Sequence, residues 1–140
     1  MRVVLDTSVI AAAFRSRHGA SNALLHAAVE RRLQVLVTTS LFLEYETVLK
    51  RPEQRLASGL TMERVDQVLA GLAALCEPVE THFQWRPQLA DAADEMVLEA
   101  AINGRADVLA TFNLRHFAGA AERFGLAVVR PAAILRMLRS

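Results

Sequence analysis

Short apolar runs alternate along the chain with longer stretches in which apolar residues recur at helical spacing. Five of these short runs predict strands, at residues 3–5, 35–37, 77–80, 108–110 and 127–129. The uninterrupted run Val3-Val4-Leu5 is typical of a parallel strand that is buried on both faces. Because predicted strands and helices alternate, we expect one α/β domain with a central parallel sheet flanked by helices.

The helical stretches carry recognisable end signals. A first helix is expected from about Thr7, and further helices over 21–32, 40–50 and 61–74, with Ser21, Ser40 and Thr61 at their starts. Pro52 is expected to end the helix over 40–50. Asp91 opens a helix that ends at Asn103-Gly104, and Pro131 lies in the first turn of a terminal helix. Residues 81–90 are expected to form a loop.

Length and charge narrow the class of protein. The 140 residues are predicted to form one domain, residues 1–140, and the net charge of +1 does not suggest a tail-driven nucleic-acid binder. The single cysteine, Cys76, excludes an intramolecular disulfide and a multi-cysteine zinc site. With no signal peptide and no apolar run of membrane-spanning length, a cytoplasmic location is expected.

Acidic and amide side chains follow several predicted strands. Asp6 follows the first strand, Glu44 lies one turn into the helix after the second, and Asp94 lies in the first turn of the helix before the fourth. Asn113 follows that fourth strand. Ligands bind beyond the carboxyl ends of strands in open α/β sheets, so these side chains are expected to converge. Converging carboxylates repel each other, and Mg²⁺ or Mn²⁺ bound by oxygen ligands relieves that repulsion.

Each of these residues also has an ordinary structural interpretation. Asp6, Asp91 and Asn113 can cap helices, and Asp94 and Glu95 can favour the positive end of a helix dipole. Glu44 lies at the margin of an apolar stripe, whereas Glu46 at the other margin can pair with Lys50. Several basic positions either contact phosphate or form an ordinary solvated surface: Arg15, Arg17, His18, Lys50, Arg51, Arg55 and Arg115. Trp85 beside Arg86 either stacks a base or anchors the loop.

Four stretches of the chain together resemble the PIN-domain superfamily, and most closely its VapC-like branch of toxins from toxin–antitoxin systems. They are VVLDTSV at 3–9, TSLFLEYETVLKRP at 39–52, DAADEMVLEAAINGRADVLATFN at 91–113 and VVRPAAIL at 128–135. The resemblance implies strand order 3-2-1-4-5 and Mg²⁺- or Mn²⁺-dependent cleavage of single-stranded RNA. It assigns the acids to Asp6, Glu44 and Asp94 and a fourth metal ligand to Asn113. It further implies a homodimer that a small antitoxin protein neutralises.

The chain departs from that family pattern at three positions. Asn113 stands where many relatives carry Asp, His116 where many carry an acid, and Ala93 where Asp is frequent. A catalytically inactive PIN-fold module that binds RNA or protein is therefore the alternative function. A phosphatase of the HAD-like class ranks below both, because it requires a second Asp at the position of Ser8.

Overall fold

The computed structural model describes residues 1–84 and 88–139. Within these residues the strands form one parallel sheet in the order β3-β2-β1-β4-β5, which confirms the expected architecture. The strands are β1 (Arg2–Leu5), β2 (Gln34–Val37), β3 (Glu77–Pro78), β4 (Val108–Ala110) and β5 (Ala127–Val129). The two alternatives for Trp85 and Arg86 lie outside the described residues.

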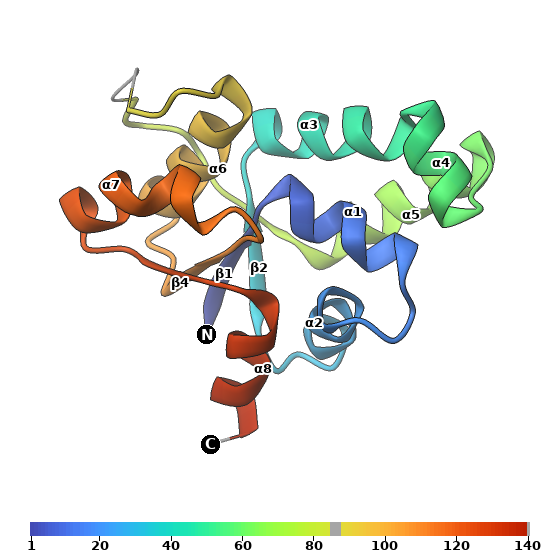
Figure 1. Ribbon diagram of the computed structural model, residues 1–140, viewed down its shortest axis with the longest axis horizontal. Coiled ribbons are helices and arrows are strands. Elements are labelled where there is room, and N and C mark those ends of the chain that lie inside the picture. Colours follow the sequence, from blue (N-terminus) through green and yellow to red (C-terminus); the bar gives the residue numbers. More distant parts are fainter. Residues whose placement is uncertain (85–87, 140) are drawn as a thin grey trace.

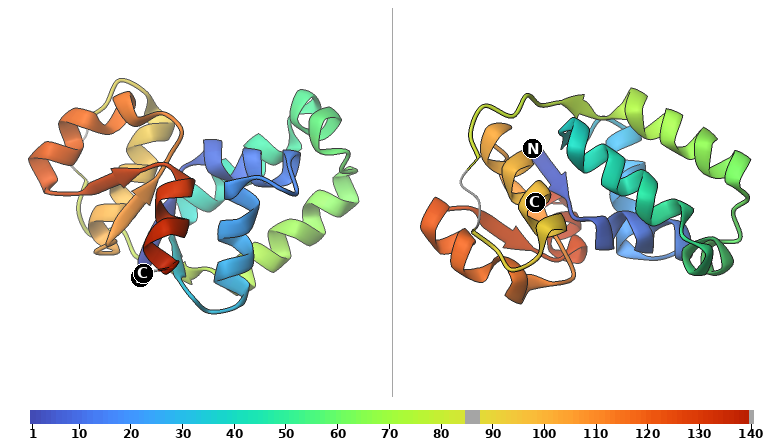
Figure 2. Two further views of the ribbon diagram at one scale, coloured as in Figure 1. Left: turned by 60° about the horizontal axis from the view of Figure 1, so that its bottom comes forward. Right: turned by 90° about the horizontal axis from the view of Figure 1, so that it is seen from above.

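Eight helices flank the sheet in the described part of the chain. They are α1 (Thr7–Arg15), α2 (Ala20–Val29), α3 (Thr39–Lys50), α4 (Pro52–Ser58), α5 (Met62–Leu75), α6 (Ala92–Asn103), α7 (Leu114–Phe124) and α8 (Pro131–Arg139). Figures 1 and 2 show α4 and α5 at one end of the molecule, α7 at the other, and the strands between them. None of the described helices is long and apolar enough to cross a membrane.

Two helix starts differ from the sequence prediction. Helix α2 begins one residue earlier than expected, with Gly19 at its N-cap, and the Ser21 hydroxyl is buried inside the helix without a hydrogen bond among the described residues. Helix α3 is capped by Thr38 rather than Ser40, because the Thr38 hydroxyl accepts a hydrogen bond from the Leu41 amide at 3.2 Å. The Thr61 cap of α5 is confirmed by its bond to the Arg64 amide.

Helix α4 was absent from the sequence prediction. Pro52 not only closes α3 but also stands at the first position of this new helix, where its missing N–H leaves no bond unmade. Gly59 ends α4 with a φ of 75°, in the left-handed conformation that favours glycine. The connection between α3 and α5 is therefore the short helix α4 and not a loop.

The central strands are buried and are covered by helices, so their side chains are not open to a ligand, whereas the ends of the strands are. Val3, Val4 and Leu5 of β1 are fully buried, as are Leu36 of β2 and Leu109 of β4. Helix α6 packs against β1 and β2, and α1 packs against β1. Since all strands run in the same direction, their carboxyl ends, which include those at Leu5 and Ala110, lie along one edge.

Candidate active site

Asp6 lies at the carboxyl end of β1, where its side chain is almost completely buried at 2% exposure. It occupies the N-cap position of α1, but its carboxylate makes no capping hydrogen bond. Instead the Asp6 Oδ2 atom accepts hydrogen bonds from the hydroxyls of Ser8 at 2.6 Å and Thr111 at 2.7 Å. The capping alternative for Asp6 is therefore wrong, and two hydroxyls hold this carboxylate in a fixed orientation.

Thr111 connects the ends of the two neighbouring central strands. Leu5 of β1 is in register with Ala110 of β4, and the Asp6 amide donates to the Ala110 carbonyl, so the next residue, Thr111, lies beside Asp6. The Thr111 hydroxyl also accepts from the Asn113 amide at 2.9 Å. Sequence reasoning missed this role, although its signal was present: Thr111 directly follows β4, as Asp6 directly follows β1.

Asp94 approaches Asp6 from the first turn of α6. Burial raises the pKa of Asp94 and the negative charge of Asp6 raises it further, while His116 opposes the shift. The Nδ1 atom of His116 lies 3.0 Å from the Asp94 Oδ2 atom. Two acids that are 88 positions apart in the sequence thus interact electrostatically, and His116 of α7 contacts one of them.

The other two acids at the start of α6 have structural roles. Asp91 caps the helix by accepting a hydrogen bond from the Ala93 amide at 2.8 Å, which confirms the capping interpretation. Glu95 is buried, and its Oε1 atom accepts from the amides of Gln88 and Leu89. The charge of Asp6 raises the pKa of the remaining acid, Asp94, whose side chain caps no helix.

Glu44 is half-buried on α3, and no hydrogen bond or ion pair joins it to another described residue. Its neighbour Tyr45 is fully buried and donates a hydrogen bond to the Leu5 carbonyl, so α3 is attached to the end of β1 directly beside Asp6. Across the described residues, no three His, Cys, Asp or Glu side chains are grouped closely enough to hold a metal ion. The participation of Glu44 in the site stays a prediction.

Asn113 occupies the N-cap position of α7 without using its side chain for capping. The residue is exposed, and only its backbone amide takes part in the Thr111 hydrogen bond. Its amide side chain is therefore available for a ligand rather than for the helix end. Whether it binds a metal stays a prediction, as for Glu44.

The basic positions named from the sequence divide into paired and unpaired groups. Lys50 forms ion pairs with Glu46 at 2.9 Å and with Asp66 at 3.0 Å, which confirms the expected pair with Glu46. Its charge is therefore neutralised on the protein itself. Arg17 and Arg115 have no ion pair among the described residues and remain candidates for phosphate contact.

Comparison with known families agrees with this geometry. Residues 2–115, most of the chain, match the family model described as PIN domain. Among curated proteins, none matches the chain.

Proposed function

The chain belongs to the PIN-domain family, whose fold is of the nuclease type, and from that premise we propose that it is a divalent-cation-dependent endoribonuclease acting on single-stranded RNA. The observation that carries the proposal is the pairing of two buried carboxylates, Asp6 and Asp94, at the carboxyl edge of the sheet. This edge is where open α/β sheets bind ligands.

The chemistry of these side chains fits Mg²⁺ or Mn²⁺. Both ions prefer oxygen ligands, and two carboxylates whose charges oppose each other are stabilised by a cation. Asp6 and Asp94 would hold it, with Glu44 and the amide oxygen of Asn113 as the further proposed ligands. A divalent cation bound there would make a water molecule more acidic and stabilise negative charge on the phosphodiester.

The surrounding side chains orient the two carboxylates. Ser8 and Thr111 both donate to one oxygen of Asp6, which leaves its Oδ1 atom with only a 3.4 Å approach from the Thr7 hydroxyl. His116 contacts one oxygen of Asp94 in the same way. In each acid, therefore, neighbouring side chains contact one carboxylate oxygen and the other oxygen can bind a ligand. Hydrogen bonds commonly orient metal ligands in this way.

The biological role that we propose is that of a toxin in a toxin–antitoxin pair. It is supported by the VapC-like order of the four matching stretches and includes a cytoplasmic homodimer that a small antitoxin protein neutralises. Expression of the chain alone should arrest growth, and co-expression of a short neighbouring gene should restore it. Normal growth with the chain expressed would contradict the toxin role without bearing on RNA cleavage.

A cleavage assay on a single-stranded RNA with Mg²⁺ or Mn²⁺ tests the proposed activity. Replacing a residue that only orients a metal ligand costs about 10–100-fold, so Asp6→Asn and Asp94→Asn should each lose at least about 100-fold. Asp91→Asn is the matched control, because Asn caps a helix as well as Asp does and activity should stay unchanged.

One observation favours the inactive alternative. His116 contacts Asp94, so an imidazole stands where a further acid would strengthen the site. If the wild-type protein binds RNA but cleaves none of it with either cation, the chain is a binding module. Cleavage that survives in Asp94→Asn would contradict the proposed site itself.

A further inference from the structure

Two neighbouring hollows away from the acids are lined by basic side chains. One, of about 320 Å³, lies between α2 and α8 and is lined by Arg17, His18, His26, Arg32 and Arg139, with Glu30 as its only acid. The other, of about 620 Å³, lies between the turn after α2 and the end of α5, and Arg31 and Arg32 line it together with Glu77, whose carboxylate is paired with Arg2. Because Arg32 lines both, we treat these six basic residues as one basic surface.

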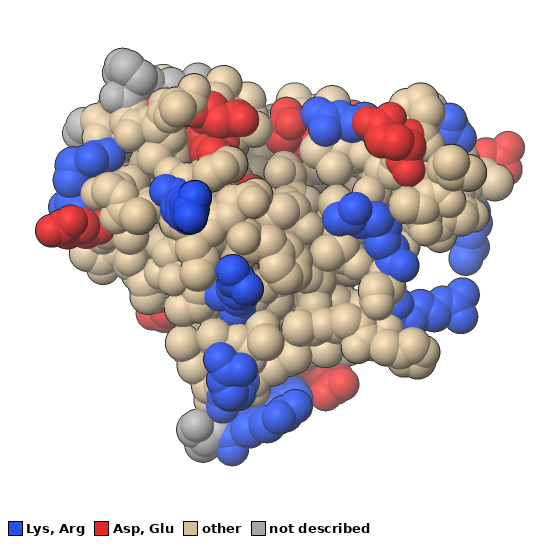
Figure 3. All heavy atoms as spheres, in the orientation of Figure 1, with Lys and Arg blue, Asp and Glu red and all other residues tan. Residues whose placement is uncertain are grey.

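The charge of the basic surface is largely unneutralised. Among the described residues, Arg17, Arg31 and Arg139 make no ion pair, and Arg32 donates only to the Leu138 carbonyl at 3.4 Å. Figure 3 shows Lys and Arg side chains gathered along α8, with an acidic side chain beside them below α2. Since the whole chain carries only +1, this is a local excess of charge that attracts a polyanion.

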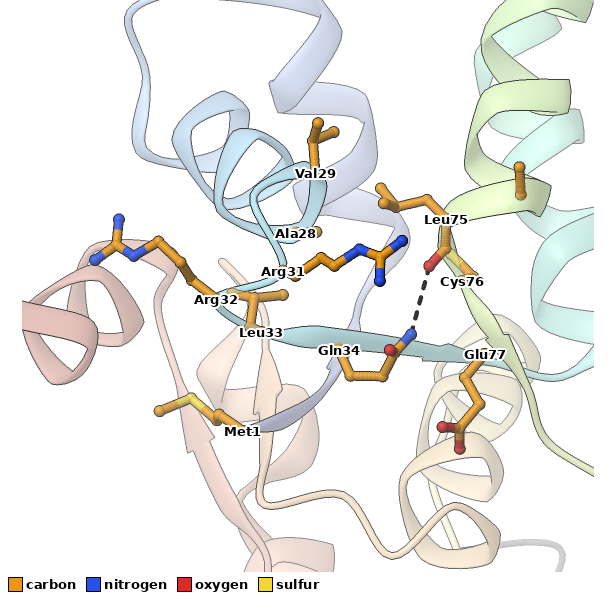
Figure 4. A pocket seen from close by; sticks show the side chains of 11 residues that line it. Met1, Ala28, Val29, Arg31, Arg32, Leu33, Gln34, Leu75, Cys76 and Glu77 are labelled. Atoms are coloured by element: carbon orange, nitrogen blue, oxygen red, sulfur yellow. Dashed lines mark hydrogen bonds between the residues drawn. The ribbon is translucent and has the colours of Figure 1, made fainter.

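Arg31 holds a backbone conformation that favours glycine. Its φ is 60°, and the amides of Arg31 and Arg32 bond to the carbonyls of Ala28 and Ala27 in a Schellman turn that ends α2. Figure 4 shows the Arg31 side chain extending across the larger hollow towards Leu75, while Arg32 points to the opposite side. The turn fixes the backbone of Arg31, so its guanidinium is presented at the larger hollow from a defined position.

We propose that the basic surface binds the phosphate backbone of single-stranded RNA, away from the carboxyl edge of the sheet where Asp6 and Asp94 lie. The choice of RNA as the polyanion rests on the proposed function. Guanidinium groups match phosphate oxygens in a bidentate geometry. Among the described residues, no Phe, Tyr or Trp side chain lines either hollow, so phosphate contacts dominate the proposed binding and little dependence on base sequence is expected.

The two surfaces are close enough for one RNA chain to reach both. The larger hollow is lined by Met1, Leu33 and Gln34, which stand at the amino ends of β1 and β2, whereas the acids lie at the carboxyl edge. A strand of four residues is about 13 Å long. RNA that extends beyond Asp6 and Asp94 can therefore also pass along α2 and α8, whereas a very short RNA cannot contact both places at once.

Fluorescence anisotropy of a labelled oligouridine, measured in chelator over a series of salt concentrations, tests this binding. Each phosphate contact with single-stranded RNA contributes about 0.7 to the slope of log affinity against log salt, so Arg17→Gln, Arg31→Gly and Arg139→Gln combined should lower that slope by about 2. The triple variant should also bind the long oligouridine more weakly, and a trinucleotide, which offers fewer phosphates to the surface, should show a smaller difference between variant and wild type.

Arg105 supplies the matched control. It follows α6 in the same kind of turn with a φ of 52°, and it lines neither hollow. Arg31→Gly and Arg105→Gly each remove one positive charge and one unfavourable φ, so both should melt at or above the wild-type temperature. Only Arg31→Gly should weaken RNA binding and lower the salt slope.

An unchanged affinity and salt slope in the folded triple variant would overturn the proposal. So would polyglutamate binding that needs these arginines and that oligouridine does not displace, because the surface would then serve an acidic protein. The assay contains no active cation, so a protein that never cleaves RNA can still bind it through this surface. Conversely, if the wild type cleaves RNA and the triple variant binds oligouridine with unaltered affinity, the RNA-binding surface is wrong and the nuclease proposal is supported.

Discussion

The two edges of the sheet use charged side chains in opposite ways. At the amino edge, Arg2 of β1 and Glu77 of β3 form an ion pair at 2.7 Å, and each side chain is about 40% exposed. The Arg2 guanidinium also donates to the Gly104 carbonyl at the end of α6. At the carboxyl edge, Asp6 and Asp94 are buried with like charges and with hydroxyl and imidazole groups as their neighbours.

The pKa shifts have opposite signs at the two edges. A hydrogen bond from Arg2 lowers the pKa of Glu77, so the charged form of Glu77 is stabilised by folding. Burial and then the charge of Asp6 raise the pKa of Asp94, so the charged form of Asp94 is destabilised by folding. The amino edge therefore contributes to the stability of the fold, and the carboxyl edge keeps a stability cost that a bound cation would remove.

The largest effect that we expect on stability at the carboxyl edge is that of Thr111→Val. The Thr111 side chain is fully buried, and the change leaves the Asn113 amide unpaired and removes one donor from Asp6. A hydrogen bond to a buried charged group such as the Asp6 carboxylate contributes about 1.5–3 kcal/mol, so unfolding in urea should show a loss of about 2 kcal/mol. Thr111→Ser keeps the hydroxyl and should lose less. Equal stability of the Val variant would mean that these hydrogen bonds do not hold the edge together.

A smaller effect of opposite sign is expected for Asp94→Asn in chelator. The amide removes a negative charge that burial and Asp6 both oppose, so the free energy of unfolding at neutral pH should rise by about 1 kcal/mol or less. Adding Mn²⁺ should raise the melting temperature of the wild type and not of the variant, because a ligand that binds only the folded state stabilises it. Asp91→Asn keeps the helix cap and should raise the free energy of unfolding less, since the charge of Asp91 raises the pKa of Asp94 less than that of Asp6 does, and the response to Mn²⁺ should be kept. A less stable Asp94→Asn would show that the contact with His116 outweighs the repulsion.

The sequence predicted the sheet well because apolar runs decide it directly. A short uninterrupted apolar run such as Val3-Val4-Leu5 indicates a strand that is buried on both faces. The helices between successive strands allow those strands to run parallel. Helix boundaries were less accurate because adjacent hydroxyl residues compete for the cap. Thr38 and Ser40 stand on either side of the start of α3, and only the buried Thr38 hydroxyl reaches the Leu41 amide.

The site was predicted only as far as topology determines it. That Asp6 and Asp94 approach one another follows from parallel strands that end at one edge. The separate roles of Asp91, Asp94 and Glu95 depend on the rotation of α6, which the packing of buried residues such as Val97 sets. Successive helical residues differ by about 100° in direction, so Asp94 and Glu95 face different groups and no spacing rule tells which one faces Asp6.

The smallest expected effect concerns the ion pair at the amino edge, in the variant Glu77→Gln. Because both side chains are well exposed, the pair should contribute less than about 1 kcal/mol at neutral pH, and added salt should reduce that further. The pKa of Glu77 is lowered from its usual value of 4.5, so its contribution is complete above that pH and is lost as the pH falls through the folded-state value. The difference in unfolding free energy between wild type and variant should therefore shrink in acid. Glu80→Gln is the control, since Glu80 is 88% exposed and contacts only His82, at 3.4 Å, among the described residues. A difference that grows in acid would show that the pair opposes folding, and the contrast between the two edges would then be wrong.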